Sequence, residues 1–225
     1  MRHGLPLHFD NGKPLLPAPA KATPALLKVK RAADVMLSIA ALLALSPVML
    51  FIATLIKATS SGPILFTQNR EGLNGEMFRM YKFRTLHWAV SDLSGVNAVT
   101  AGDPRLTPVG AVFRRTSIDE LPQLINIILG DMSLVGPRPH VPGMLVGENR
   151  YDEVVPYYSL RHRMKPGLTG WAQVNGLRGV VETRQSAKAR VDHDLAYIAN
   201  YSVLLDIEIL LWTIWQEVVR LGRGP

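Results

Sequence analysis

Hydrophobic residues are concentrated in one uninterrupted run near the start of the chain. From Val35 to Ile56 there are 22 residues without a charged side chain. A straight helix of that length would extend ~33 Å at ~1.5 Å per residue, enough to cross a hydrocarbon core of ~30 Å. The pattern therefore predicts a membrane helix.

Pro47 interrupts this run. Proline lacks an N–H group and clashes with the carbonyl four residues earlier, so we expect a kink near Leu43–Pro47. The hydroxyl of Ser46 can bond the freed carbonyl, which makes the break tolerable in lipid. The residues thus predict a break at Ser46-Pro47.

Basic residues flank the run on both sides, and positive charge marks the cytoplasmic side of a membrane. A hairpin with arms Val35–Leu45 and Pro47–Ile56 would enter one leaflet and return, whereas a kinked helix would span the bilayer. The residues alone leave both topologies open. The flanking positions are Lys28, Lys30 and Arg31 before the run, and Lys57, Arg70, Arg79, Lys82 and Arg84 after it.

The segment before the run predicts no regular structure. Residues 1–27 contain five prolines and no apolar periodicity, so they read as a disordered tail. They do not resemble a signal peptide, because the hydrophobic run begins too late. We divide the chain into this tail, a membrane segment at 28–59 and a single domain at 60–225.

A β-hairpin is predicted directly after the membrane segment. Ile64–Thr67 and Met77–Phe83 are rich in apolar and aromatic residues, and Asn74-Gly75 between them is a strong turn signal. Lys82 and Arg84 lie two residues apart and therefore on one face of the second strand. Residues 86–107 are polar and irregular, which is typical of a surface loop.

The rest of the chain reads as mainly helical. Apolar residues recur at helical spacing over 121–129, with Gly130 placed to end the helix, and 186–201 reads as a charged helix. Residues 151–178 mix loops and short helices. The expected fold is α+β and mostly helical, with a re-entrant membrane hairpin if that topology holds.

The last segment is an amphipathic helix. Its polar residues share one face, and apolar residues with Trp212 and Trp215 fill most of the remainder, which suits a helix lying in the membrane interface. A helix packed into an ordinary core fits as well. The polar face consists of Asp206, Thr213, Glu217 and Arg220.

The amino-acid composition narrows the classes of possible binding partner. The 225 residues include 25 Lys and Arg against 18 Asp and Glu, a net charge of 25 − 18 = +7, which suggests nucleic acid, an anionic membrane or a phosphorylated substrate. Aromatic residues make up only 7% and are not interleaved with the basic ones, so nucleic acid is poorly supported. The absence of cysteine excludes disulfides and thiolate zinc sites.

The stretch TSIDELPQL, residues 116–124, carries the best candidate chemistry. Ser117 and Glu120 fit a helix capping box, and Asp119 would then be only a carboxylate that the helix dipole favours. Pro122 argues against a regular first turn. An Asp119-Glu120 pair at an irregular helix start could instead divide two roles, one carboxylate attacking and the other holding a metal.

Basic residues near this pair favour the chemical interpretation. Arg114 and Arg115 come just before the acids, and the prolines of GPRP fix the backbone around Arg138. With Mg²⁺ bridging the carboxylates and a diphosphate, such a set forms a phosphoryl-transfer site. The segment 165–176, KPGLTGWAQVNG, could bind a base or sugar or could be an Ω-loop.

These motifs together resemble a known family. KRAADVMLS, YKFRT, the block DPRLTPVGAVFRRTSIDELPQLINIILGDMSLVGPRP and KPGLTGWAQVNG resemble the bacterial sugar transferases known as monotopic polyprenyl-phosphate phosphoglycosyl transferases. The resemblance runs from about Lys28 to Leu221. It implies an enzyme on the cytoplasmic face of the bacterial inner membrane, with a re-entrant hairpin broken at Ser46-Pro47.

The resemblance also implies a reaction. Such enzymes transfer a sugar 1-phosphate from a UDP-sugar to undecaprenyl phosphate, release UMP and start glycan assembly. Asp119 would be the nucleophile that becomes covalently linked to the sugar phosphate, and Asp119 and Glu120 would hold Mg²⁺. The implied substrate-binding residues are Lys82, Arg84, Arg114, Arg138, Lys165 and Gln173.

Several properties stay open. PRPH and AQVNGLRG resemble the branch that often transfers glucose 1-phosphate, and galactose 1-phosphate is the other candidate. Many relatives have an acidic residue and a threonine after the final glycine, whereas this chain has Val180-Val181. The sequence leaves undecided whether the chain forms a homodimer. A membrane-anchored scaffold without catalysis, and a transferase with another nucleotide-activated donor, are the alternatives.

Overall fold

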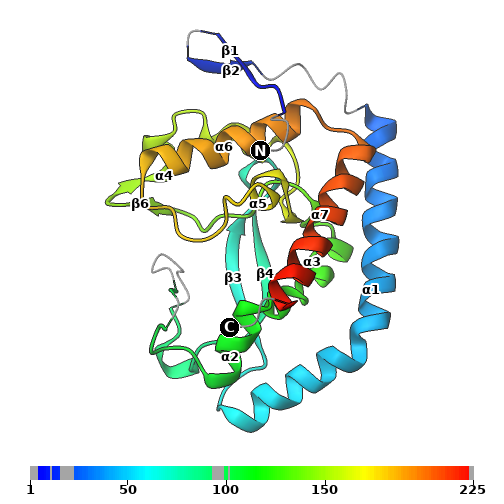
Figure 1. Ribbon diagram of the computed structural model, residues 1–225, viewed down its shortest axis with the longest axis vertical. Helices are drawn as coiled ribbons and strands as arrows, with labels where there is room; N and C mark the ends of the chain where they lie inside the picture. Colours follow the sequence, from blue (N-terminus) through cyan, green and yellow to red (C-terminus); the bar gives the residue numbers. More distant parts are fainter. Residues whose placement is uncertain (1–4, 11, 16–22, 93–98, 101, 223–225) are drawn as a thin grey trace.

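The structure is a computed structural model that describes residues 5–10, 12–15, 23–92, 99–100 and 102–222, with the side chains of 220–222 left out. It combines helices with four two-stranded sheets within these residues. Figure 1 shows one long helix, α1, curving along one side of the remaining elements. The mixture of helices and strands expected from the sequence is confirmed, although only about half of the chain is helical.

Helix α1 runs from Pro24 to Thr59. Thr23 caps it, accepting a hydrogen bond from the backbone N–H of Leu26 at 3.3 Å, and Pro24 follows at the start, where its missing N–H costs nothing. The helix continues through Pro47 without a break in its assignment, and Figure 1 shows it bending part-way along. The predicted kink is therefore present, but the expected interruption of the helix is not.

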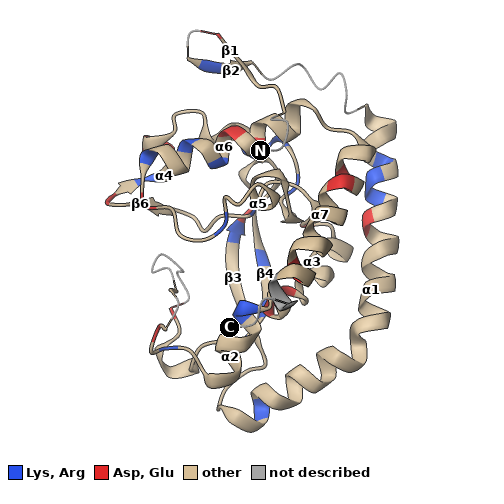
Figure 2. Ribbon diagram, in the orientation of Figure 1, with Lys and Arg blue, Asp and Glu red and all other residues tan. Residues whose placement is uncertain are grey.

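The long helix exposes most of its apolar surface, and Figure 2 shows charged residues only toward its two ends. It is the one helix in the described residues that is long and apolar enough to cross a membrane, and only 11% of its most apolar stretch is buried inside the molecule. One side packs on the rest of the chain through Ile52 and Ile56, which meet Phe83 and Phe113. Leu43, Leu50 and Phe51 are more than half exposed. A core helix would bury such residues.

Part of the tail that was expected to be disordered is ordered. Strands β1, His8–Asp10, and β2, Lys13–Leu15, pair antiparallel, and α1 already begins at Pro24. Leu5 and Leu7 pack against two of the core clusters, and Phe9 lies edge-on to Tyr157 with ring centroids 6.1 Å apart. These alternating apolar residues supply the burial that the prolines seemed to preclude.

The predicted hairpin is confirmed. Strand β3, Leu65–Glu71, pairs antiparallel with β4, Met77–Phe83. Asn74, with φ 55°, and Gly75, with φ 81°, provide the left-handed turn conformations that the Asn-Gly pair predicts. Figure 1 shows the hairpin in the middle of the molecule, beside helices α2 and α3.

The segment after the hairpin sets up the candidate acids. Helix α2, Pro108–Arg115, is capped by Thr107, and a short 3-10 helix η3, Ile118–Glu120, precedes α3, Gln123–Leu129. The predicted capping box is wrong: Ser117 has φ 56° and makes no capping bond, because Pro122 moves the start of α3 beyond the acids. Gly130, with φ 103°, ends α3 as expected.

The C-terminal half wraps around the parallel pair of β5, Ser133–Val135, with β8, Gly167–Thr169. Its helices pack over this pair and enclose two of the core clusters. The other elements are η1 Leu73–Gly75, η2 Trp88–Val90, β6 Leu145–Val146, β7 Asn149–Arg150, α4 Tyr151–Val154, η4 Tyr158–Arg163, α5 Trp171–Val174, α6 Arg184–Ala199 and α7 Val203–Gly222.

Buried polar contacts fix α1 to this half. Lys30 forms an ion pair with Asp206 of α7 at 2.6 Å, and the same carboxylate accepts a hydrogen bond from Tyr197 at 2.6 Å. Asp34 accepts hydrogen bonds from the Ser133 hydroxyl at 2.7 Å and the Leu134 N–H at 3.2 Å. The upper part of α1 is thereby tied to the strand that leads into GPRP.

Helix α7 is amphipathic, but much of its apolar face points outward, whereas a helix on the surface of a soluble protein turns its polar face outward. Thr213 and Glu217 point inward, where Thr213 bonds Thr169 at 2.7 Å and Glu217 pairs with Arg178 at 2.6 Å, whereas Glu208 is exposed. Leu205 and Ile209 are buried, but many apolar side chains face outward, and Leu204, Leu211, Ile214, Trp215 and Val218 are all more than half exposed. The Arg220 side chain lies outside the described residues. An exposed apolar face of this kind is typical of a surface that binds a membrane or another protein.

Candidate active site

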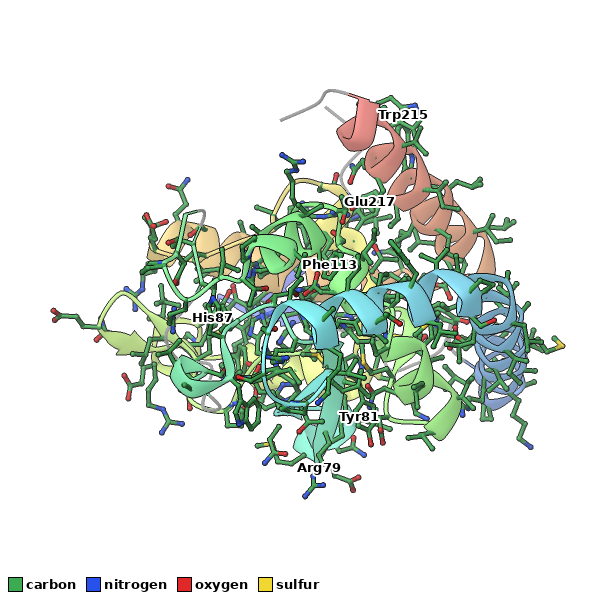
Figure 3. The ribbon with its side chains drawn as sticks, turned by 90° about the horizontal axis from the view of Figure 1, so that it is seen from below. Arg79, Tyr81, His87, Phe113, Trp215 and Glu217 are labelled. Carbon is green, nitrogen blue, oxygen red and sulfur yellow. The ribbon has the colours of Figure 1, made fainter. Side chains whose placement is uncertain are left out.

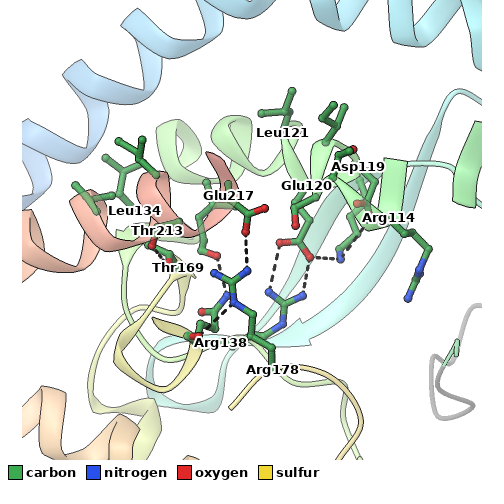
Figure 4. Close-up of a pocket in the computed structure, with 18 of the residues that line it drawn as sticks. Arg114, Asp119, Glu120, Leu121, Leu134, Arg138, Thr169, Arg178, Thr213 and Glu217 are labelled. Carbon is green, nitrogen blue, oxygen red and sulfur yellow. Dashed lines mark hydrogen bonds and ion pairs between the residues drawn. The ribbon is translucent and has the colours of Figure 1, made fainter. Parts of the chain in front are cut away.

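Three segments bring the predicted acids and cations together. Lys82 comes from β4, Asp119 and Glu120 come from η3, and Arg138 comes from the GPRP segment that follows β5. The Lys82 ammonium lies 2.8 Å from Glu120 Oε1 and 3.9 Å from Asp119 Oδ2. Asp119 is 4% exposed. Figure 4 shows the side chains converging on one pocket of about 450 Å³, with Arg138 opposite the acids.

Arg138 is held in place by its backbone. Its guanidinium binds Glu120 through two hydrogen bonds, Nη2 to Oε1 at 2.6 Å and Nη1 to Oε2 at 3.3 Å. Its carbonyl accepts a hydrogen bond from Arg161 at 2.6 Å, and the carbonyl of Pro137 accepts one from the Gly167 N–H at 2.9 Å. A Cβ atom at Gly136 would lie 2.4 Å from the Lys165 carbonyl, which explains why glycine precedes Pro-Arg-Pro.

The two carboxylates differ electrostatically. Burial raises the pKa of the Asp119 carboxyl, and the charge of Glu120 adds to this, although Lys82 opposes it. Burial alone would also raise the pKa of Glu120, but Arg138 and Lys82 outweigh it and hold that pKa well below its usual range. Glu120 is thus an ionised, neutralised partner, whereas Asp119 is a desolvated base with one cation at 3.9 Å.

Comparison with known proteins identifies the family of this chain. The family model described as bacterial sugar transferase matches residues 25–220. The chain belongs to the bacterial sugar transferase family. This confirms the resemblance inferred from the sequence motifs and makes the protein an enzyme of that class.

Individual relatives carry more specific names. The transferase is similar to an exopolysaccharide production protein of Rhizobium leguminosarum bv. phaseoli, 48% identical over 198 residues, covering 88% of this chain and 98% of that protein. It is also similar to the UDP-glucose:undecaprenyl-phosphate glucose-1-phosphate transferase of Escherichia coli (strain K12), 43% identical over 213 residues, which are 93% of this chain and 45% of that protein.

A third relative has another sugar in its name. The UDP-N-acetylgalactosamine-undecaprenyl-phosphate N-acetylgalactosaminephosphotransferase of Aeromonas hydrophila is 40% identical over 208 residues, 92% of this chain and 47% of that protein. The transferase therefore spans nearly all of the Rhizobium relative but less than half of the other two.

Not every residue predicted to bind substrate lies in the pocket. Arg114 and Gln173 line it. Arg84 lies outside this pocket: its guanidinium donates to the carbonyls of Ser60, Ser61 and Pro63, and the residue, which is 1% exposed, borders a second recess that also includes Lys82 and Asp119.

Lys165 also lies away from the acids. Its ammonium is near Gly130 and faces the charges of Arg31, Asp131 and Asp34 rather than the pocket. The signal that suggested it, its place at the start of KPGLTGWAQVNG, reflects backbone packing instead. Its carbonyl and the following glycine lie against Gly136, so this turn supports the backbone of GPRP.

The structure adds pocket residues that the sequence analysis did not identify. Arg178 donates to Glu217 of α7 at 2.6 Å and to the Gln173 carbonyl at 3.3 Å, and these residues close one side of the pocket (Figure 4). The amide oxygen of Gln173 is buried there without a hydrogen-bond partner in the described residues, so a ligand N–H or O–H would satisfy it. Only tertiary contacts reveal these roles.

The donor set for a metal is small. Within the described ranges, no group of three or more His, Asp or Glu side chains could hold a metal ion. Mg²⁺ is usually bound by one or two carboxylates together with substrate phosphates. Asp119 accepts no hydrogen bond from the described residues and has free oxygens for such an ion, whereas Glu120 would have to share oxygens that already accept from Lys82 and Arg138, with a diphosphate supplying the other ligands.

Proposed function

We propose that the transferase moves a sugar 1-phosphate from a UDP-sugar to undecaprenyl phosphate, releases UMP and starts exopolysaccharide-type glycan assembly. The names of its relatives support this reaction, with glucose as the first sugar to test. The observation that carries the proposal is the pair of unlike carboxylates. Glu120 is neutralised by Lys82 and Arg138, while buried Asp119 keeps its oxygens available to attack.

In this proposal Asp119 is the nucleophile of a two-step reaction. One carboxylate oxygen attacks the phosphorus attached to the sugar, the bond from that phosphorus to the bridging oxygen breaks, and UMP leaves with the bridging oxygen. An oxygen of the lipid phosphate then attacks the same phosphorus and releases the Asp119 carboxylate. A covalent intermediate lets two anionic substrates react in turn instead of meeting directly.

The cations reduce the repulsion between these anions. Lys82 and Arg138 are preorganised by Glu120, so they can stabilise charge on the transferring phosphoryl oxygens without reorganising at the moment of reaction. Arg114 lines the same pocket and adds positive charge near Asp119. Mg²⁺ bound through Asp119 and Glu120 would supply further neutralisation of the diphosphate.

The membrane attachment follows the same logic. We infer that residues 28–59 form the re-entrant segment, that α7 lies in the interface with its outward apolar face against lipid, and that residues 60–225 form the catalytic domain on the cytoplasmic face of the bacterial inner membrane. The bent, mostly exposed α1 and the outward Trp215 support this arrangement. The acceptor phosphate lies at headgroup depth, where such an anchor would hold the pocket.

Measurement of UMP tests the reaction. Protein in lipid nanodiscs is mixed with Mg²⁺, undecaprenyl phosphate and a panel of UDP-sugars. We expect UMP release with at least one sugar and none from Asp119→Asn, which keeps the shape of the side chain. Release that persists in Asp119→Asn would rule out this nucleophile, and no release with any sugar would favour a membrane-anchored scaffold. Release only with another nucleotide-sugar would favour the alternative donor.

Cysteine labelling tests the topology, because the chain has no native cysteine. Lys28 and Glu76 are exposed positions before and after the apolar run. Lys28→Cys and Glu76→Cys should both react with an impermeant maleimide only when it is added from the cytoplasmic side. Reaction of one of them from the periplasm would restore a spanning helix.

A further inference from the structure

Two recesses meet at the Asp119 carboxylate. The first is the pocket of about 450 Å³ described above, and the second, of about 660 Å³, lies between the β3–β4 hairpin and the segment after GPRP. They share the residues at the centre of the site, and only the first includes residues of α7. The shared residues are Lys82, Arg114, Asp119, Arg138 and Gly179.

The first recess is apolar on the side that faces α7. Leu134, Leu168, Leu210 and Ile214 line it, and Ile214 is also 61% exposed on the outward face of the helix. One side chain thus belongs both to the recess and to the surface that we place against lipid. A molecule with a phosphate and a hydrocarbon chain could reach Asp119 from the membrane along these apolar side chains, beside the Thr213 and Glu217 side chains that also line the recess.

The second recess is lined by more basic side chains than the first, and Arg70 lines only the second. Its Nη1 donates to the Pro139 carbonyl at 3.3 Å and its Nη2 to the Gln68 side-chain oxygen at 2.5 Å. Its Nε is buried without a hydrogen-bond partner, and among the described residues no carboxylate lies within ion-pair distance of it. The side chain is therefore held in place by neutral groups while its charge is uncompensated.

Such an arrangement is costly unless an anion completes it. Arg70 is partly buried, its Nε has no hydrogen-bond partner and no carboxylate of the described residues forms an ion pair with it, which together destabilise a fold. Burial and the charge of Arg138 together lower the pKa of Arg70 to about 10 against the opposing charge of Glu120, so the group remains charged at neutral pH. Its planar fork suits phosphate oxygens, and Arg138 lies beside it at the junction of the two recesses.

We propose that Arg70 binds the diphosphate of the UDP-sugar in the second recess, and that the first recess receives the phosphate and adjoining hydrocarbon of the lipid acceptor. This assignment rests on the proposed function. It lets UMP leave through one recess while the lipid phosphate arrives through the other, with the sugar phosphate on Asp119 between them. The two substrates then need not share one entrance.

Direct binding of UDP tests the donor recess. We compare Arg70→Gln with Arg79→Gln, because Arg79 is an exposed arginine of the same hairpin that lines neither recess and points away from the body in Figure 3. By calorimetry on full-length protein in nanodiscs, Arg70→Gln should bind UDP about ten- to a hundredfold more weakly, as expected for losing a charged hydrogen bond. Arg79→Gln should bind it like the wild type. Arg70→Lys keeps the charge and should lie between them.

Steady-state kinetics test the division between recesses. Arg70→Gln should raise the KM for the UDP-sugar at least fivefold more than the KM for undecaprenyl phosphate. Ile214→Ser, at an exposed position, should do the reverse. Equal changes in both constants, or UDP binding in Arg70→Gln that matches the wild type, would overturn the assignment.

The proposed reaction and the role of Arg70 are tested by different results. Absence of UMP release by the wild-type protein with every UDP-sugar would overturn the reaction itself. Release by the wild type combined with unaltered UDP binding in both Arg70→Gln and Arg70→Lys would overturn only the role of Arg70. If Arg70→Gln does not fold, the Arg70→Lys variant still decides, because a phosphate ligand must show weaker UDP binding when its fork is lost.

Discussion

The hydroxyl of Ser46 donates a hydrogen bond of 2.9 Å to the carbonyl of Leu43. Leu43 lies four residues before Pro47, so its carbonyl is the one that the missing proline N–H would have served. The serine therefore satisfies the acceptor that the proline leaves open. This local exchange allows α1 to bend inside an apolar segment without a bare carbonyl in lipid.

Replacing the proline should straighten the helix. In Pro47→Ala the backbone N–H of residue 47 can bond Leu43 again, and a straight run of 22 uncharged residues would be long enough to span. We expect Lys28→Cys in the Pro47→Ala background to react partly with impermeant maleimide from the periplasm. In the native background it should react only from the cytoplasm.

Ser46→Ala provides the matched control for this experiment. It keeps the proline and removes only the substitute hydrogen bond, so the bend and the labelling pattern should stay as in the native chain while thermal stability falls. If Pro47→Ala also keeps purely cytoplasmic labelling, the proline does not determine the topology.

Local signals predicted the elements that carry the site. The Asn74-Gly75 turn fixed the hairpin and with it the placement of Lys82, and Pro122 indicated that α3 begins beyond the acids. Tertiary partners decided the rest. The alternation of strand side chains makes Lys82 and Arg84 equivalent. In the structure, however, the Arg84 guanidinium binds backbone carbonyls beyond the end of α1, whereas the Lys82 ammonium binds Glu120. No local pattern could reveal that choice.

Long-range contacts also explain the other differences. Arg70 stood out in the sequence only as a basic flank of the apolar run, because its role depends on Pro139 and on the recess it lines. The N-terminal segment likewise forms ordered strands because it contacts the distant C-terminal half, for example through the 2.8 Å hydrogen bond from Asn200 to the Pro6 carbonyl. Both features are visible only after the chain has folded.

The charge of Glu120 should affect the pH dependence of the first half-reaction. Attack requires ionised Asp119, whose pKa burial and Glu120 raise and Lys82 lowers. In Glu120→Gln a raising influence disappears and Lys82 loses its nearer partner, so the acidic limb of the UMP burst rate should move to lower pH. In Lys82→Gln a lowering influence disappears, so the limb should move to higher pH.

Single-turnover UMP release without acceptor, between pH 4.5 and 8, measures these shifts. The position of the limb is compared rather than the plateau rate, because both variants also weaken substrate binding. Shifts in the same direction for Glu120→Gln and Lys82→Gln would show that a group other than Asp119 sets the acidic limb.

The buried Arg161–Asp194 pair should be essential for stability. Its side chains are 1% and 2% exposed and lie 2.8 Å apart. Arg161→Met leaves an unpaired buried carboxylate and should lower the free energy of unfolding by about 3–5 kcal/mol. Arg150→Met, which breaks the exposed pair with Asp152, should cost at most about 1 kcal/mol.

Chemical denaturation in mild detergent compares these variants. The double variant Arg161→Met with Asp194→Leu removes both charges, so it should recover most of the lost free energy. Equal losses in Arg161→Met and Arg150→Met would contradict the assignment of the buried pair as the critical one. Because Arg161 also donates to the Arg138 carbonyl, the double variant should remain less active than the native enzyme.

Acidification should destabilise the protein through His140. Burial, and then the charges of nearby arginines, hold the pKa of this ring well below its ordinary value of 6.5. The unfolded state therefore binds more protons below about pH 6.5, so the free energy of unfolding should fall by up to about 1.4 kcal/mol per pH unit between pH 6.5 and 5.5. His140→Phe, which keeps an aromatic ring beside Tyr151, should flatten this slope, whereas replacing the exposed His87 by Phe should not. A slope that survives in His140→Phe would assign the proton uptake to another group.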